Sequence, residues 1–248
     1  WQSVGAKGVV TLASKLMLAL LPAQTSFFKL QLDESQLGTT PPEIKTELDL
    51  SFAKIERTIM DAISASTDRV VIHQALKHLV VAGNALIFMG KDGLKLFPLN
   101  RYTLERDGNG NVIEIVTKEL INRKILEELV PDIKEMKGEY TNDGEEEPED
   151  CEVYTHVRRD NNRFVWHQEV YDHIIPKSQG KSPLETTPWI PLRFNTVDGD
   201  DYGRGRVEEF MGDLKSLEAL SQALVEGSAA AAKVVFTVSP SSTTKPAT

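Results

Sequence analysis

Apolar residues recur at helical spacing in three long stretches of the chain, 3–21, 43–66 and 205–233. Side chains three and four residues apart lie along one side of an α-helix, so each stretch is predicted to be helical. In the first stretch apolar residues occupy most faces, and we expect that helix to be largely buried before it ends at Pro22. The third stretch would be one helix of about 29 residues, roughly 43 Å long at 1.5 Å per residue.

The third stretch has the pattern of a helix that packs against neighbours along its length. Its apolar positions are Val207, Phe210, Leu214, Leu217 and Leu224, flanked by Met211, Leu220 and Val225. The small residues Gly227, Ser228 and 229–232 follow, and small residues let helices approach closely. This pattern is typical of an assembly element rather than of a catalytic site.

Between the second and third of these stretches the apolar period changes to two, the period of a β-strand. A shorter helix comes first, which Asp68 is expected to cap at Val70 or Val71 and Gly83 to end. Three β-hairpins follow, with turns at 90–93, 107–110 and 160–162. Their strands are predicted at 85–89 and 94–98, at 102–106 and 112–117, and at 152–159 and 163–171.

Three further segments complete the predicted order of elements. Residues 27–32 are expected to be extended, and residues 118–137 to be helical with a break at Pro131. Residues 189–194 should form an edge strand, because Pro191 has no N–H group to donate to a neighbouring strand. Helices followed by hairpins and then one long helix indicate an α+β fold rather than repeated βαβ units.

The charge of the chain argues against tight binding of nucleic acid. The formal net charge is -9, and eight acidic residues with no basic one lie between Glu139 and Glu152. Tight binding of a phosphate backbone needs clustered Lys and Arg, although an acidic wall still permits loose contact with DNA. The acidic run itself is expected to be a solvated loop.

Two other features of the composition limit the class of protein. The single cysteine, Cys151, excludes a disulfide framework and a cysteine-rich zinc site. The apolar stretch 9–21 contains Lys15 and is shorter than the ~20 residues that a membrane span requires. Because the sequence begins with Trp1 and ends in Ser, Thr, Pro and Lys, we expect it to be an internal piece of a longer chain.

No motif of enzyme chemistry is present in the sequence. Gly203 and Gly205 open a helix but lack the third glycine of a dinucleotide-binding fingerprint, and residues 198–201 lack the rest of a calcium loop. None of the five histidines has the spacing of a zinc ligand pair. His156, His167 and Asp172 could meet across a hairpin, but no nucleophile elbow accompanies them. We therefore expect no metal, no cofactor and no enzymatic activity.

Several stretches, taken together and in order, resemble the portal protein, or head-to-tail connector, of short-tailed bacteriophages of the autographivirus group. The residues that carry the resemblance are 1–8 and 12–20, 75–77 and 79–84, 154–156, 190–191, 202–204, 208–209, 212–214 and 216–218. Matches spread in order over nearly the whole chain are more specific than one short motif.

The resemblance implies a fold division and a place in the virion. Residues 1–201 would be the wing region, 202–233 the first stem helix beside the channel, and 234–248 the start of the clip. Family members form dodecameric rings at one unique vertex of the capsid, assembled in the bacterial host cytoplasm. DNA is packaged and ejected through the ring.

The resemblance also implies the partners, none of which is a membrane. They would be other copies of the chain, the major capsid and scaffolding proteins, tail adaptor and nozzle proteins, the terminase, internal core proteins, and double-stranded DNA that passes without sequence specificity. Another ring component of the virion, such as a tail adaptor, is the alternative function. A nucleic-acid-binding enzyme is a more distant one, because it would need a basic groove lined by aromatic residues.

Polar and small residues of the last helix are the candidate functional residues. In a ring, one face of this helix would contact neighbouring subunits and another would line the channel. The candidates for these two roles are Glu209, Asp213, Lys215, Ser216, Glu218, Gln222, Glu226, Ala229 and Ala232. Acids slightly outnumber bases in this helix, which gives a surface on which DNA could slide.

Overall fold

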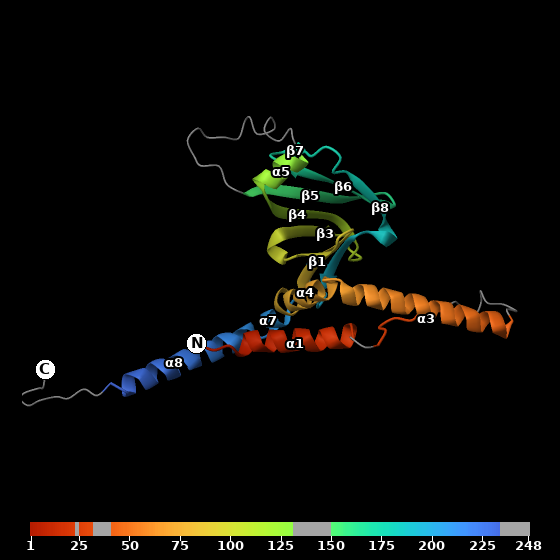
Figure 1. Cartoon of the computed structure of the whole chain (residues 1–248). Helices are drawn as coiled ribbons and strands as arrows, with labels where there is room; N and C mark the ends of the chain where they lie inside the picture. Colours follow the sequence, from red (N-terminus) through yellow and green to blue (C-terminus); the bar gives the residue numbers. More distant parts are fainter. Residues whose placement is uncertain (23–24, 32–40, 131–149, 234–248) are drawn as a thin grey trace, which may run out of the picture.

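The structure is a computed structural model that describes residues 1–22, 25–31, 41–130 and 150–233. Two antiparallel sheets lie at its centre, one above the other (Figure 1). The smaller sheet has the order β2-β1-β9, from β1 (Asn84–Gly90), β2 (Gly93–Phe97) and β9 (Trp189–Arg193). Strand β9 lies at the edge of this sheet, as Pro191 predicted.

The larger sheet has the order β3-β4-β5-β6-β7, and β8 pairs with the other end of β6. Its strands are β3 (Tyr102–Arg106), β4 (Val112–Asn122), β5 (Asp150–Asp160), β6 (Arg163–Val170), β7 (His173–Ile174) and β8 (Gly180–Pro183). Short 3-10 turns, η1 (Leu99–Arg101) and η2 (Leu184–Thr186), connect the two sheets. All three predicted hairpins are confirmed, and with them the α+β class.

Helices cover the face of the small sheet that is turned away from the large one. Helix α4 (Asp68–Ala82) lies on this face, and α1 (Val4–Leu20) packs on α4 (Figure 1). Strand β1 is therefore enclosed on both sides: Ala85 and Ile87 face the helices, while Leu86 faces the large sheet. This position explains why four consecutive residues of β1 are buried, where a sheet with one wet face would alternate.

The hydrophobic core has three parts. The first joins α1, α4 and the small sheet, and the second lies between the two sheets around Trp189. The third is at the far end of the large sheet, where α5 (Arg123–Leu129) covers it with Leu126. Most of these core residues lie at inward positions of elements that the sequence pattern predicted, α5 included, whereas Ile175 of the third part lies outside any predicted element.

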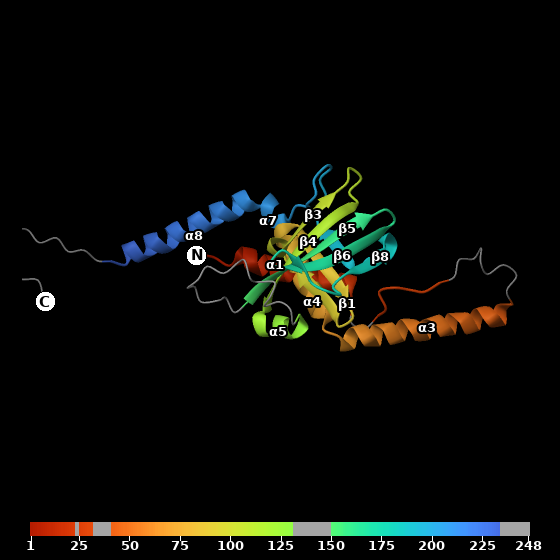
Figure 2. The same cartoon turned by 90° about the horizontal axis from the view of Figure 1, so that it is seen from above.

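Two long helices extend from this body in opposite directions (Figures 1 and 2). Helix α3 (Pro42–Ala65) confirms the second helical stretch, and α8 (Met211–Ala231) forms most of the third. Residues 27–31 form no strand and accompany α3, where the Leu30 N–H donates to Glu56 Oε1 at 2.6 Å. Leu32 lies outside the described residues.

Three sequence predictions about local structure are wrong, the first of which concerns the burial of α1. Only Ala13 and Met17 of this helix are buried, whereas the Leu18 side chain is 66% exposed. Helix α4 is the main neighbour of α1 and covers one side of it. Leu18 is exposed because it lies on a side of α1 that α4 does not cover.

The segment 118–137 is also different from its prediction. Strand β4 continues to Asn122 because Lys118–Asn122 pair with β5, and the helix that follows is only seven residues long. The Asn122 side chain accepts a hydrogen bond from the Lys124 N–H and so caps this helix. The predicted break at Pro131 lies outside the described residues, as does the loop at 139–149.

Asp68 does not cap α4. Its Oδ1 accepts a hydrogen bond from the Leu94 N–H at 2.8 Å and so ties the helix to the start of β2. The Val70 N–H instead bonds to the carbonyl of Thr67 at 2.9 Å. At the other end Gly83 has φ +74, which confirms it as the left-handed residue that ends the helix.

Candidate assembly surface

The third helical stretch begins at a tightly packed junction with the body, which we call the root and define as Gly203, Arg204 and Gly205 with Asn84 and Asn195. The buried Asn84 side chain donates to the Gly203 carbonyl at 2.7 Å and accepts from the Gly203 N–H at 2.7 Å. It also donates to the carbonyl of Ala82. Asn195 and Arg204 pair as an isolated antiparallel bridge. The root therefore fixes where the helix leaves the body.

The two glycines of the root are needed because backbones meet there. A Cβ atom on Gly205 would lie 2.3 Å from the carbonyl oxygen of Val81. A Cβ atom on Gly203 would lie 2.8 Å from the carbonyl oxygen of Asn195. These distances are too short for any side chain. The Gly203 and Gly205 pair is thus a packing motif between α4 and the root.

The helix predicted as one piece is two pieces. Helix α7 (Arg206–Glu209) is separated from α8 by Phe210, which has φ −100 and ψ 12. Glu209 contacts the body through Asn195 Nδ2 and is paired with Arg206, both at 2.7 Å. The first turn is thus held on the root, while the remaining 21 residues form α8.

Helix α8 has no buried residue. Leu220, Leu224 and Val225 are 64%, 71% and 51% exposed. Among the described residues it contacts the start of α1, where Gly5 lies under Leu214 and the Trp1 nitrogen donates to Glu218 Oε1 at 2.8 Å. Beyond that contact the helix extends alone from the body (Figure 2).

The nine candidate residues do not share one face of α7 and α8. At about 100° per residue, Lys215, Glu218, Gln222 and Glu226 lie within one arc of roughly 80°, and Ala229 lies within the same arc. Asp213 and Ser216 are on the opposite side, near Leu220. Glu209 is on α7, and Ala232 follows the end of α8.

Local bonds hold several of these side chains. Gln222 donates to Glu226 at 2.9 Å, and Ser216 donates to the carbonyl of Gly212 at 3.0 Å. Glu209 and Glu218 contact other parts of their own chain, as described above. The candidates that are exposed on α8 are Asp213, Lys215, Ser216, Gln222, Glu226 and Ala229.

The outer face of the large sheet is polar. His156 and His167 face each other across β5 and β6 with ring centroids 5.3 Å apart, and each is paired with a glutamate, Glu114 and Glu169. The predicted meeting of the two histidines is confirmed. The described residues contain no group of three or more His, Cys, Asp or Glu side chains that could hold a metal ion.

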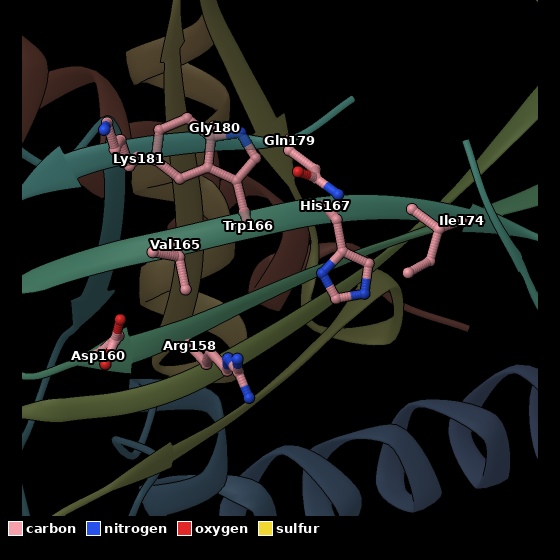
Figure 3. A pocket seen from close by; sticks show the side chains of 9 residues that line it. All are labelled: Arg158, Asp160, Val165, Trp166, His167, Ile174, Gln179, Gly180 and Lys181. Carbon is pink, nitrogen blue, oxygen red and sulfur yellow. The ribbon is translucent and has the colours of Figure 1, made fainter. Parts of the chain in front are cut away.

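At the end of this face near β8 lies a groove of about 470 Å³ (Figure 3). Val165 and His167 project into it from one side of β6, while the Trp166 indole is on the other side (Figure 3). Arg158 and Lys181 flank Val165 on the neighbouring strands. Trp166 packs on the backbone of Gly180, where a Cβ atom would lie 2.2 Å from the ring.

Residues 1–248 match the family model described as bacteriophage head to tail connecting protein. The chain belongs to this family. It is 39% identical over 99% of its length to the portal protein of Enterobacteria phage T3, and 37% identical to that of Escherichia phage T7. It is also 32% identical to the portal protein of Enterobacteria phage SP6. The chain spans about half the length of these relatives, 47% for T3 and T7 and 48% for SP6.

Sequence reasoning missed the residue that fixes the root of this member of the connecting-protein family. The sequence pattern gives Asn84 no structural role of its own, and nothing in its neighbourhood along the chain predicts a partner 119 residues away. The sequence did offer a signal at the other side of the contact, because two glycines separated by one residue are typical of close backbone approach. No described helix is long and apolar enough to cross a membrane.

Proposed function

We propose that this chain is part of a portal subunit that forms a ring with other copies at one vertex of a phage capsid. In this proposal residues 1–201 are the wing region, 202–233 form the first stem helix, and 234–248, outside the described residues, begin the clip. The ring would be a dodecamer and a conduit for double-stranded DNA. The portal proteins of T3, T7 and SP6 to which the chain is similar support this assignment.

The observation that carries the proposal is the exposure of α8. A helix of this length is only marginally stable in water unless an apolar face is covered. Leu220 and Leu224 form an apolar stripe with the partly covered Leu217, and they are 64% and 71% exposed among the described residues. Neighbouring copies arranged in a ring would cover such a stripe on every subunit by the same heterologous contact.

Native mass spectrometry and negative-stain imaging of the full-length protein test the ring. We expect closed rings of about twelve copies with an open channel, as the resemblance implies. Replacing Leu220 and Leu224 by glutamate should abolish the rings, because two charges would enter an apolar contact. Gln222→Glu, an exposed change on the same helix, is the matched control and should leave them intact. A stable monomer or dimer of the unaltered full-length protein at micromolar concentration contradicts the proposal.

We assign the polar arc of α8 to the channel. Lys215, Gln222 and Glu226 lie in this arc, away from the apolar stripe. Their replacement by alanine should alter the rate of DNA packaging and leave ring assembly unchanged. If ring assembly fails and the packaging rate of the remaining rings is normal, these residues belong to a subunit interface.

The proposed partners are those of a portal vertex: capsid and scaffolding proteins, tail adaptor and nozzle proteins, internal core proteins and the terminase. The subunit would therefore be a structural component of the virion. Co-purification of each partner with rings, and not with the variant in which Leu220 and Leu224 are both replaced by glutamate, tests whether these contacts need the assembled ring.

A further inference from the structure

The groove on the outer face of the large sheet carries positive charges that have no partner in the described chain. Arg158, Arg163 and Lys181 line or border it, and no hydrogen bond or ion pair of these side chains is present within the described residues. Asp160 is the one carboxylate in its lining, and its Oδ1 accepts from Asn161. With His167 neutral, the groove and its border thus carry an excess of two positive charges in a chain whose net charge is -9.

The rest of the same face is different. Lys118 is paired with Glu152, and the Tyr154 hydroxyl donates to Glu152 at 2.7 Å. These contacts, that with Lys118 first, hold the pKa of Glu152 below its usual range. The charges of Lys118 and Glu152 therefore compensate each other at that end, whereas the three cations of the groove have no such partner among the described residues.

The groove combines these cations with an apolar floor. Val165 and Ile174 supply aliphatic surface, and Gln179 and His167 supply polar atoms beside it (Figure 3). Such a lining suits an acidic peptide whose carboxylates reach the cations and whose backbone lies on the floor. The groove is open to solvent, so a small molecule in it would keep much of its surface in water.

The chain itself contains a segment of this chemistry. Residues 139–150 hold seven acidic residues, one tyrosine and no basic residue. We propose that the groove binds this acidic segment of a neighbouring copy. The inference rests on the proposed function, because it needs copies placed side by side.

Covalent geometry favours a neighbouring copy over the same chain. Arg158 is eight residues along β5 from Asp150, about 27 Å at 3.4 Å per residue. Glu147 is three residues before Asp150, and three residues of chain span at most about 11 Å. The carboxylates of Glu147 and Glu149 therefore cannot meet Arg158 of their own chain.

In a ring of identical copies, contact between these two regions would be electrostatically favourable. Each copy carries the cations at one end of β5 and the acidic segment at the other, so repeated copies can place unlike charges together. Residues 1–248 carry nine excess negative charges in each copy, so these regions of neighbouring copies repel one another. Complementary contacts between neighbours reduce this repulsion and fix their relative position.

Zero-length crosslinking of the full-length protein tests the contact. A carbodiimide joins a lysine amine to a carboxylate only when the two are close enough to form an ion pair. Rings are assembled from a mixture of 14N-labelled and 15N-labelled copies, crosslinked, digested and analysed by mass spectrometry. We expect Lys181 joined to glutamates of 145–149 in peptides that combine both isotopes, with a yield that falls as salt is raised.

Two matched variants and one internal control sharpen the result. Lys181→Arg keeps the charge and removes the amine, so the crosslink should vanish while the rings remain. The crosslink should also vanish when four glutamates of the acidic segment are replaced together by glutamine, namely Glu145, Glu146, Glu147 and Glu149. Lys177 is an exposed lysine four residues away and should not crosslink to the acidic segment.

Each other outcome counts against the inference. Rings without the Lys181 crosslink, or with it only within one isotope, contradict binding by a neighbouring copy and leave the portal assignment untouched. If Lys177 crosslinks to the acidic segment as much as Lys181 does, the acidic segment is attracted to lysines without specificity for the groove. A DNA duplex could instead protect Lys181 from crosslinking, and the glutamine variant of the acidic segment could leave that crosslinking unchanged. This result would make the groove a binding site for phosphate. If the full-length protein forms no rings, the proposed function fails and this inference fails with it.

Discussion

The buried side chain of Asn84 should control how α7 and α8 are attached to the body. The proposed change is Asn84→Ala, which removes the donor to the Gly203 carbonyl and the acceptor of the Gly203 N–H. Both backbone groups belong to a buried residue, and no other hydrogen bond serves them among the described residues. Only the position of the root depends on these bonds, because β1 keeps its pairing on both sides.

The expected cost follows from the hydrogen bonds lost. Each buried backbone group left without a partner costs about 1–3 kcal/mol, and water entering the space of the missing amide recovers part of it. We therefore expect a loss of about 2–4 kcal/mol in the free energy of unfolding. For a domain that is stable by about 5–15 kcal/mol, this is a substantial fraction.

Urea denaturation followed by tryptophan fluorescence measures the loss, with Asn109→Ala as the control. Asn109 is in an exposed turn, and its side chain has no hydrogen bond within the described residues, so its removal should change the free energy by less than about 0.5 kcal/mol. Protease cleavage within 196–206 should also accelerate in Asn84→Ala only. Equal stability of Asn84→Ala and the unaltered protein, with no gain in cleavage, would refute the role of Asn84.

The variant Asn84→Asp gives a second test, in which the direction of the change in stability with pH can be predicted. A carboxylate would face the carbonyls of Gly203 and Ala82, and burial would raise its pKa above the unfolded value. The protonated acid can donate to a carbonyl as the amide did. Stability of this variant, relative to the unaltered protein, should therefore be greatest below the unfolded pKa and fall as pH rises through the folded pKa. If the difference in stability between Asn84→Asp and the unaltered protein does not change with pH, this reasoning is contradicted.

Three further outcomes are expected. Gly205→Ala should destabilise by several kcal/mol and loosen α7, because its Cβ would meet the Val81 carbonyl at 2.3 Å; differential scanning calorimetry measures it. Gly180→Val should displace Trp166 and separate β8 from β6. Faster hydrogen exchange in β8 would show this separation, and Trp166→Phe, which keeps an aromatic ring, is the milder control. Burial, followed by the contact with the Cys151 thiol, raises the pKa of Tyr171 to about 12, so this group contributes stability that is complete below pH ~10 and is lost as pH rises toward 12. Tyr171→Phe should flatten that part of the stability curve relative to the unaltered protein in alkaline urea titrations.

The sequence by itself determined the elements whose signals are local. The 3.6-residue period marked α1, α3 and most of the last helix, Gly83 marked the end of α4, and the period of two with Gly, Asn and Asp turns marked all three hairpins. Pro191 identified β9 as an edge strand. These predictions succeeded because the side chains of one element alternate or repeat by its own geometry, without reference to any partner.

The burial and the length of the elements were predicted less accurately, because both depend on neighbouring segments. The apolar faces of α1 and α8 predicted cover that the described chain does not supply. Segment 118–122 has helical composition but pairs with β5, and this pairing outweighs its propensity. The nine candidate residues were chosen from one helix, yet the break at Phe210 and the turn angle of α8 divide them between faces.

Contacts between distant segments were decided by the tertiary structure alone. Asn84 meets Gly203 across 119 residues, Asp68 meets Leu94 instead of its own helix, and Trp166 packs on Gly180. The groove formed by β5, β6 and β8 likewise gathers unpaired cations that are scattered along the sequence. A hydrogen bond or an ion pair depends on where two atoms lie in space. A single sequence records the order of residues along the chain, so it contains the local periods but not these distances.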